Sequence, residues 1–259
     1  MHYHSLFISD IHLGTKQCHI EYLLKFLHDN TFNNVFLIGD TIDFHSLSRN
    51  WYWSQDHNTF IQKILRMSRK GTHVVIIPGN HDIILREWIK EISPFFFGDI
   101  VIVEEFEYLS IHNQKFLLLH GDKYDGIIRS MHWLYWLGDK TYSVITDINT
   151  LYNKIRKLFG QDYWSLSSYL KSQVKETIQI INKFDELVTH ECTYKNYDGI
   201  IYGHTHTPYI KTINNKIIMN DGDVCENVTC IIETMSGKFQ LIKMTNNSIL
   251  QESFPTSVK

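Results

Sequence analysis

Five short motifs rich in Asp, His and Asn could supply ligands to metal ions. Their carboxylate and amide oxygens and imidazole nitrogens form a mixed donor set, which suits Mn²⁺, Fe or Zn²⁺ better than Ca²⁺. Paired cations held by such groups can activate water for hydrolysis. No cysteine falls in the motifs, which argues against a structural zinc site. The motifs are Asp10-x-His12, Gly39-Asp40, Gly79-Asn80-His81-Asp82, His120-Gly121-Asp122 and Gly203-His204-x-His206.

Each motif directly follows an apolar run that is typical of a buried strand. In open α/β sheets, ligands gather at the carboxyl ends of strands, so loops distant in sequence can converge there. One such motif is weak evidence, because Asp-x-His and Gly-Asp are common in ordinary turns. An ordered set of five is far more specific, since each coincidence would have to fall at a strand end. The predicted strands are residues 5–9, 35–38, 73–77, 116–119 and 199–202.

Strand-like runs alternate with amphipathic stretches at residues 17–29 and 58–69, which predicts an α/β fold. The residue pattern changes over residues 127–189, where proline is absent and long helical patterns carry many aromatic residues. Strand-like runs return after residue 190, with hairpin signals at Asn214-Asn215 and Ser236-Gly237. The sequence therefore predicts a core of residues 1–126 and 190–259 with a helical insertion, or lid, at residues 127–189.

The composition indicates a soluble globular protein. Of 259 residues, 43% are hydrophobic and 20% are charged, and the formal net charge is −3. This balance gives no support to a nucleic-acid binder, which usually carries a strongly basic face. The four cysteines form no C-x-x-C pair, so we expect reduced thiols in a cytoplasmic protein. There is no signal peptide and no apolar run of about 18 residues, so any membrane contact would be peripheral.

The ordered motif set resembles the calcineurin-like metallophosphoesterase superfamily. The resemblance implies a four-layer α/β/β/α sandwich and two divalent metal ions, Mn²⁺ first, with Fe or Zn²⁺ as alternatives. No ligand position of the superfamily pattern is missing, so the resemblance implies an active enzyme. Carried over by position, it implies that Asp10, His12 and His206 hold one ion, that Asn80, His120 and His204 hold the other, and that Asp40 bridges both.

Such a site has a coherent chemistry. Two cations about 3.5–4 Å apart can clamp a phosphoryl group and lower the pKa of bound water toward about 7. Both oxygens of Asp40 could face a cation, and ligand histidines must be neutral, so activity should fall in acid. By similarity, His81 lies beside the scissile phosphate and stabilises charge or protonates the leaving oxygen. Asp82 is expected to orient His81 or, with equal weight, to cap a following helix.

Further segments resemble one branch, the UDP-2,3-diacylglucosamine diphosphatase family, which cleaves the diphosphate of an acylated nucleotide sugar in lipid A synthesis. Two positions depart from that branch: His81 stands where its best-known members carry Arg, and Val224 stands where Trp is expected. The segments that carry the resemblance are Ser9–Thr15, Trp51–Trp53, His120–Asp125, Tyr163–Ser167 and Asn220–Asp223 with Glu226-Asn227.

This branch implies hydrolysis of UDP-2,3-diacylglucosamine to UMP and 2,3-diacylglucosamine 1-phosphate. An aromatic lid could cover the acyl chains and touch the cytoplasmic face of the inner membrane. Arg49, Arg86 and Lys123 could contact the diphosphate or nucleotide, although solvation is the commoner role of a single surface cation. The sequence does not indicate an oligomeric state.

Two alternatives stay open at this stage. The chain could be a general metallophosphoesterase that acts on small nucleotides or other phosphoesters. It could also be a scaffold that kept the fold and lost catalysis, although such a scaffold would be expected to lack some ligands. Cleavage of the acylated nucleotide sugar would distinguish the diphosphatase from a general metallophosphoesterase. Metal analysis would test whether the chain is an inactive scaffold.

Overall fold

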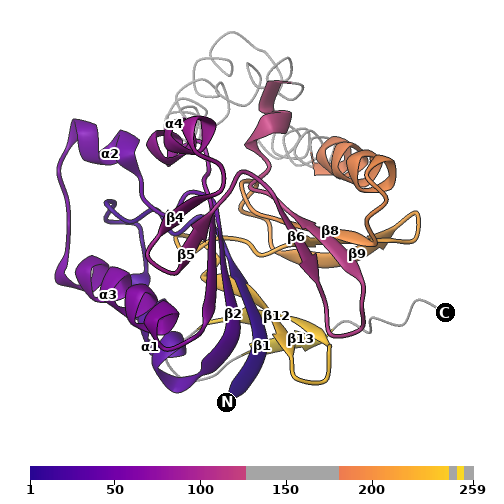
Figure 1. The fold of residues 1–259 in the computed structure, drawn as a ribbon, viewed down its shortest axis with the longest axis horizontal. Helices are drawn as coiled ribbons and strands as arrows, with labels where there is room; N and C mark the ends of the chain where they lie inside the picture. Colours follow the sequence, from indigo (N-terminus) through magenta and orange to yellow (C-terminus); the bar gives the residue numbers. More distant parts are fainter. Residues whose placement is uncertain (127–180, 245–249, 254–259) are drawn as a thin grey trace, which may run out of the picture. The chain divides into compact units, whose positions relative to one another are not determined.

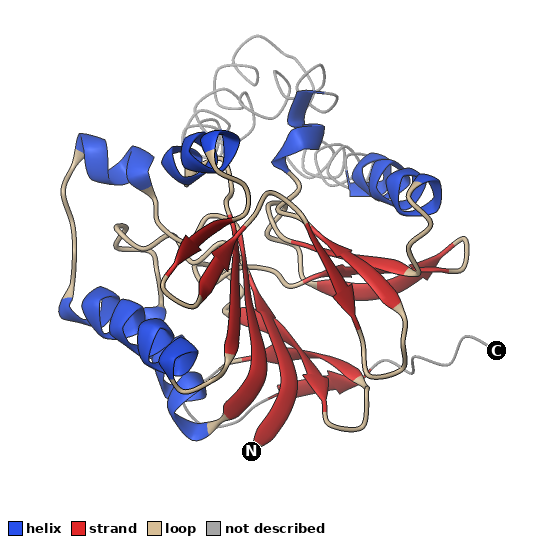
Figure 2. Cartoon of the chain, in the orientation of Figure 1, coloured by secondary structure: helices blue, strands red, loops and turns tan. Residues whose placement is uncertain are grey.

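The computed structural model describes residues 1–126, 181–244 and 250–253 (Figures 1 and 2). The chain divides into two compact units. The first comprises Met1–Asp122 with Val188–Lys259, and the second comprises Lys123–Leu187. Most of the insertion expected at residues 127–189 lies outside the described residues, so the lid stays a prediction. The first unit carries all five motifs.

A mixed sheet of eight strands runs through the described part of the first unit. In spatial order its strands are β13 (Leu250–Ser253), β12 (Phe239–Lys243), β11 (Thr229–Thr234), β1 (His2–Ile8), β2 (Thr31–Ile38), β3 (His73–Ile77), β5 (Ile100–Ile102) and β4 (Phe95–Phe97). β1, β2, β3 and β5 are parallel neighbours, while the flanking strands are antiparallel. The four residues that end β2, Val35–Ile38, are all buried, as expected for a parallel strand covered on both faces.

A second sheet of five strands is also described in the first unit. In spatial order its strands are β6 (Phe106–Leu109), β7 (Lys115–Leu118), β8 (Gly199–Tyr202), β10 (Lys216–Asn220) and β9 (Tyr209–Ile213). β7, β8 and β10 are parallel, and β9 and β10 form the hairpin predicted at Asn214-Asn215. The carboxyl ends of β7 and β8 therefore lie at the same edge of this sheet.

The first unit contains the helices α1 (Ile20–Asp29), α2 (Phe44–Arg49), α3 (Gln55–Arg69) and α4 (Ile83–Glu91), and the short helix η1 (Asp122–Tyr124) follows β7. Two of these four α-helices, α2 and α3, begin at a residue whose side chain caps them. α3 begins three residues before the predicted start because Ser54 caps it. The Ser54 hydroxyl accepts from the amide of His57, and the His57 ring accepts from the amide of Ser54.

Two apolar cores hold the layers together. One lies between the first sheet and helices α1 and α3, and includes Leu6, Leu23 and Phe60. The other lies between the two sheets and includes Phe7 and Phe116. Residues 188–194 are helical and lie beside the second sheet, with Val188 fully buried (Figure 1). This arrangement confirms the predicted α/β/β/α class.

Within the described residues, no helix is long and apolar enough to cross a membrane.

Candidate metal centre

The five motifs lie in loops that follow strands of both sheets. In chain order, the loops carry Asp10 and His12 after β1, Asp40 after β2, Asn80 after β3, His120 after β7, and His204 and His206 after β8. The two sheets contribute to one site, because Asp40 Oδ2 of the first sheet lies 3.4 Å from His120 Nε2 of the second. Side chains 80 residues apart in sequence are thereby brought into contact.

Asp10, His12 and His206 form one group of potential ligands. Asp10 Oδ1 lies 3.1 Å from His206 Nε2 and 3.7 Å from His12 Nε2. One ligand atom from each residue fits within a span of 4.8 Å. Three converging donors at this spacing could hold one divalent cation.

Asp40 belongs to a second group of potential ligands, together with Asp10 and His120. Its Oδ2 lies 3.4 Å from His120 Nε2 and 3.8 Å from His12 Nε2, so one oxygen looks toward both sides of the site. Its Oδ1 instead accepts a hydrogen bond of 2.8 Å from the amide of His81. The sequence suggested that each oxygen of Asp40 would face a cation. In the structure Oδ2 lies toward both His12 and His120, while Oδ1 accepts from the His81 amide, and which oxygen meets which cation stays a prediction.

Asn80 and His204 complete the predicted set. The ring centroid of His204 lies 5.0 Å from that of His120. Asn80 Oδ1 is buried and has no hydrogen-bond partner. Its neighbour Gly79 packs directly against Asp40, since a Cβ added there would lie 2.0 Å from Asp40 Oδ1. Only glycine allows the loop after β3 to approach the loop after β2 this closely.

The backbone of the site is strained at the proposed ligands. Positive φ angles are uncommon for residues other than glycine, and they persist where surrounding structure enforces them. Five of the seven predicted ligands have them: Asp10 (48°), His12 (51°), Asp40 (50°), His204 (66°) and His206 (50°). The fold therefore holds these side chains in directions that relaxed loops would not adopt.

Supporting contacts fix which atom of each residue faces the site. His120 Nδ1 lies 2.9 Å from the carbonyl oxygen of Ile38, which leaves Nε2 free to act as a ligand. His12 Nδ1 is held in the same way, 3.1 Å from Asp43 Oδ2. Asp10 Oδ2 accepts from the amide of His204 at 2.8 Å and the hydroxyl of Ser9 at 2.6 Å, so Oδ1 is the oxygen presented.

The carboxylates make this site strongly attractive to cations. Burial alone would lower the pKa of His12, but the neighbouring carboxylates of Asp10 and Asp43 raise that pKa to about 10. His120 is fully enclosed, and the charge of Asp40 nevertheless raises its pKa to about 10. The carboxylates of the site therefore favour the protonated form of both imidazoles when no metal competes for them.

The donor set fits divalent cations on structural grounds. Buried polar atoms almost always have hydrogen-bond partners, so unpartnered ones call for an explanation. Four such atoms belong to the predicted ligands: Asp10 Oδ1, His12 Nε2, Asn80 Oδ1 and His120 Nε2. Cations bound between them would satisfy all four.

Metal binding to the metal-free protein should release protons. His12 and His120 have pKa values raised to about 10, and each must lose a proton to coordinate. Roughly two protons should appear per chain at pH 8. Because protons compete with the metal, affinity should rise as pH increases toward 10 and fall in acid. A pH indicator in weakly buffered solution measures the release during titration with Mn²⁺.

The His12→Ala variant provides the control for this titration, because it should release about one proton fewer. Metal binding without proton release at pH 8 would contradict the electrostatics described for the site.

His81 lies at the same site with an acidic partner. Its Nδ1 lies 3.0 Å from Asp43 Oδ1, and its Nε2 lies 4.0 Å from Asp40 Oδ2. Asp43 also contacts His12 Nδ1 through its other oxygen, so one carboxylate supports two imidazoles. Burial would raise the pKa of Asp43, but these two histidines hold it well below its usual range. His81 is thus oriented with Nε2 toward the metal ligands.

Asp82 is the N-cap residue of α4, as one of the two expectations placed it, but its side chain neither caps that helix nor orients His81. Its oxygens accept from the backbone amides of Thr41 at 2.9 Å and Ile42 at 2.7 Å, and α4 receives no side-chain cap from it. The carboxylate beside His81 is Asp43. Burial and the charge of Asp40 raise the pKa of Asp82 to about 6. Asp82 therefore fixes the loop that carries Asp40 and does not contact His81.

The three candidate substrate cations have different surroundings. Arg86 makes a two-pronged ion pair with Asp122 at 2.5 and 2.6 Å and donates to the carbonyl oxygen of Pro78, so its guanidinium ties two loops of the site together. Arg49 is exposed at the end of α2. Lys123 belongs to the second unit, where its Nζ lies 5.3 Å from the ring centroid of Tyr124. Substrate contact by these residues stays a prediction.

Sequence reasoning gave no role in the site to Asp43 or to Asp221, although Asp221 lies in a segment that carries the family resemblance. Asp43 lies three residues after Asp40 and caps α2 by accepting from the amide of Ser46, so an Asp-x-x-Asp spacing was the available signal. Asp221 is completely buried behind Asp10. The Ser9 hydroxyl oxygen lies 2.5 Å from Asp221 Oδ1, and burial raises the pKa of Asp221 well above its usual value. No local pattern marks such a contact between β1 and the loop after β10.

A family model described as calcineurin-like phosphoesterase matches residues 3–208. The chain therefore belongs to the calcineurin-like phosphoesterase family, as the motif set predicted. It is a hydrolase of phosphoester bonds, and the family implies divalent metal ions, for which the site provides groups of ligands.

Relatives named UDP-2,3-diacylglucosamine hydrolase are similar to most of the chain. The protein from Photorhabdus laumondii is 24% identical over 97% of this chain and 99% of its own length. The protein from Haemophilus influenzae is 25% identical over 93% of this chain and 99% of its own length. Among solved structures, the phosphoesterase Yfce from E. coli has a TM-score of 0.48 and 14% identity, covering 97% of this chain and 99% of its own.

Proposed function

We infer that this chain hydrolyses the diphosphate of UDP-2,3-diacylglucosamine, releasing UMP and 2,3-diacylglucosamine 1-phosphate, with two Mn²⁺ ions. The observation that carries this proposal is the extent of the similarity to the two relatives with that name. The similarity spans 99% of both relatives, and it extends beyond residues 3–208, which the general family model matches. A substrate shared with those relatives is the simplest reason for a match of that length.

The proposed ligand assignment follows the two groups of donors. Asp10, His12 and His206 would hold one ion, and Asn80, His120 and His204 would hold the other. Asp40 would bridge them through Oδ2, the oxygen that faces both His12 and His120. When bound, the cations would polarise a phosphoryl oxygen and lower the pKa of water toward about 7.

His81 is the proposed proton donor to the leaving oxygen. Its Nε2 points toward the ligands, 4.0 Å from Asp40 Oδ2, where a reacting phosphate would be bound. Asp43, 3.0 Å from Nδ1, would keep a proton on that nitrogen and fix the ring. A proton at Nε2 could then pass to the departing oxygen as its bond to phosphorus breaks.

The acyl chains of the proposed substrate were assigned to the lid, together with peripheral contact with the inner membrane. That region falls almost entirely outside the described residues, so both assignments stay predictions. The proposed location in the cytoplasm rests on the sequence alone.

A second candidate is a general phosphoesterase that acts on smaller phosphoesters. The observation that favours it is the His81 and Asp43 pair. An imidazole with a carboxylate partner can protonate many leaving groups, so the pair does not by itself require a nucleoside monophosphate as the product.

The two candidates predict different substrate preferences. Purified protein with Mn²⁺ should cleave UDP-2,3-diacylglucosamine with kcat/KM at least about 100-fold above that for UDP-glucose, because several kcal/mol of binding energy would come from the acyl chains. Release of UMP can be followed by chromatography, with bis(4-nitrophenyl) phosphate as a generic substrate. Cleavage of the generic substrate with no activity on the acylated one would replace the first candidate by the second.

A further inference from the structure

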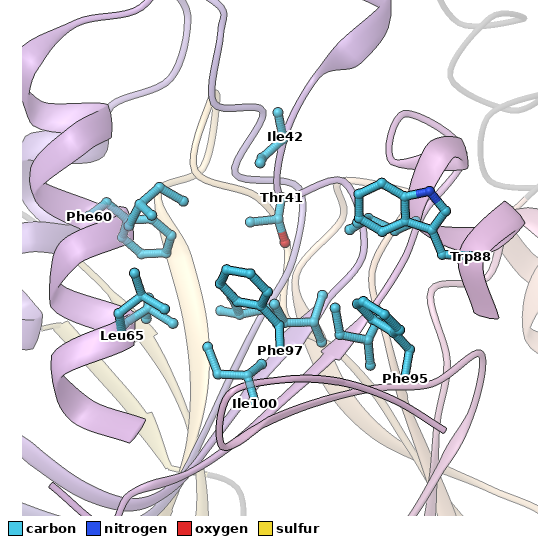
Figure 3. A pocket seen from close by; sticks show the side chains of 14 residues that line it. Thr41, Ile42, Phe60, Leu65, Trp88, Phe95, Phe97 and Ile100 are labelled. Carbon is cyan, nitrogen blue, oxygen red and sulfur yellow. The ribbon is translucent and has the colours of Figure 1, made fainter. Parts of the chain in front are cut away.

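An apolar cavity of about 240 Å³ lies beneath the loop that carries Asp40 (Figure 3). Its walls come from α3, α4, the strands β2 to β5, and Thr41 and Ile42 of that loop. All of these elements belong to the first unit. The described lining of the cavity therefore belongs entirely to the phosphoesterase core.

The apolar lining of this cavity favours an alkyl chain as its ligand. Apart from Thr41, every residue that lines it is apolar. Engineered apolar cavities of about 150 Å³ stay dry and bind benzene, so a larger cavity of this kind has room for several methylene groups. Two lining side chains, Trp88 at 51% and Phe97 at 59%, are exposed although they are large and apolar. A bound chain would cover them and gain free energy from the apolar area removed from water.

Thr41 is the one polar residue in the described lining of the cavity. The residue is only 4% exposed, and its Oγ1 is buried with no hydrogen-bond partner. Figure 3 shows this oxygen directed toward the apolar side chains of the cavity.

A second cleft adjoins the cavity and supplies charge. The two share Leu65, Phe97 and Ile100, so they meet along one wall. Arg66, Arg69 and Asp99 also line the cleft, and two guanidinium groups with one carboxylate leave a net charge of +1.

Neither arginine of this cleft makes an ion pair within the described ranges. Ser68, which is 6% exposed, also lines the cleft, and its hydroxyl has no hydrogen-bond partner. The cleft therefore offers a monoanion two guanidinium groups and one hydroxyl.

We propose that the cavity and the cleft together form a binding site for a fatty acid. Its alkyl chain occupies the apolar cavity, and its carboxylate lies at Arg66 and Arg69. A monoanion matches the charge of the cleft, whereas a phosphate dianion would leave excess negative charge beside Asp99. The site is separate from the metal ligands, and the proposal holds whichever phosphoester the enzyme hydrolyses.

Calorimetric titration of the full-length, metal-loaded protein tests the proposal, with excess metal removed. Decanoate should bind with a stoichiometry of one. The Leu65→Glu variant places a carboxylate where the cavity meets the cleft, and it should weaken decanoate binding at least about tenfold. Leu65 is 40% exposed, so the fold should tolerate the change. The matched control is Leu109→Glu on β6, at a position 51% exposed and outside both cavities, which should bind like the wild type.

The head group is tested separately with ligands of the same chain length. The double variant Arg66→Gln, Arg69→Gln should weaken decanoate binding about tenfold and leave binding of 1-decanol unchanged. Decyltrimethylammonium should bind more weakly than decanoate to the wild type. Decanoate binding that fails to saturate, that survives Leu65→Glu unchanged, or that is matched by the cationic amphiphile would overturn the proposal.

Discussion

Replacing Asp40 with alanine should abolish turnover while the fold is retained. Asp40 Oδ2 is the oxygen that lies between His12 Nε2 and His120 Nε2, at 3.8 and 3.4 Å, so no other carboxylate can substitute for it as the bridge. Loss of a bound cation removes several kcal/mol of transition-state stabilisation, so kcat should fall at least about 10³-fold. Metal content measured by mass spectrometry should fall from two ions per chain to one or none.

The Asp40→Asn variant separates charge from packing. Its side-chain oxygen can still accept from the amide of His81, as Oδ1 of Asp40 does at 2.8 Å. Turnover and metal content should nevertheless fall as they do in Asp40→Ala. Asp56→Ala, at an exposed position in α3, is the matched control and should behave like the wild type. Full activity with two bound ions in Asp40→Asn would remove the basis for a bridging carboxylate.

Replacing His81 with alanine should slow the reaction while metal content stays unchanged. His81 is not among the proposed ligands, and its Nε2 lies where a proton could reach the leaving oxygen. Loss of a general acid typically costs about 10²- to 10⁴-fold in rate. The loss should be much smaller for a 4-nitrophenyl ester, because nitrophenolate departs without a proton. A comparison of kcat for the two kinds of leaving group measures this difference directly.

Asp43 provides a second test of the same step. If it positions His81, then Asp43→Asn should slow the reaction mainly for poor leaving groups, and adding it to His81→Ala should cost little more for those substrates. Asp43 also contacts His12, so metal content must be measured in each variant. His28→Ala, at an exposed position of α1, is the matched histidine control. Equal rate losses for good and poor leaving groups in His81→Ala would argue against proton donation.

The hydrogen-bond partners of Asp82 could not be predicted from its position in the sequence. A carboxylate directly after His81 and before a helix suggested either an orienting contact or a helix cap. In the structure, its oxygens accept from amides of Thr41 and Ile42, which lie 40 residues earlier in the chain. Asp43 provides the contact with His81 instead. The choice between two nearby carboxylates depended on how two loops pack, and sequence spacing does not encode that packing.

Arg86 illustrates the same point for a cation. Its position just after a motif suggested contact with a diphosphate. Its guanidinium is paired in two-pronged geometry with Asp122, a residue of another motif. The sequence analysis noted both residues but did not predict their ion pair. The pair forms because the loops after β3 and β7 converge in the fold.

The sequence alone predicted the order of the candidate ligand residues, the strands that precede them and the α/β class. It could do so because parallel strands buried on both faces read as apolar runs, and because ligands must follow their carboxyl ends. Only the tertiary structure decided that Asp40 Oδ2 lies near both His12 and His120, that Asp43 supports two histidines, and that an apolar cavity lies beneath the loop after β2. These features depend on side-chain directions between segments distant in the chain, which no local pattern of residues specifies.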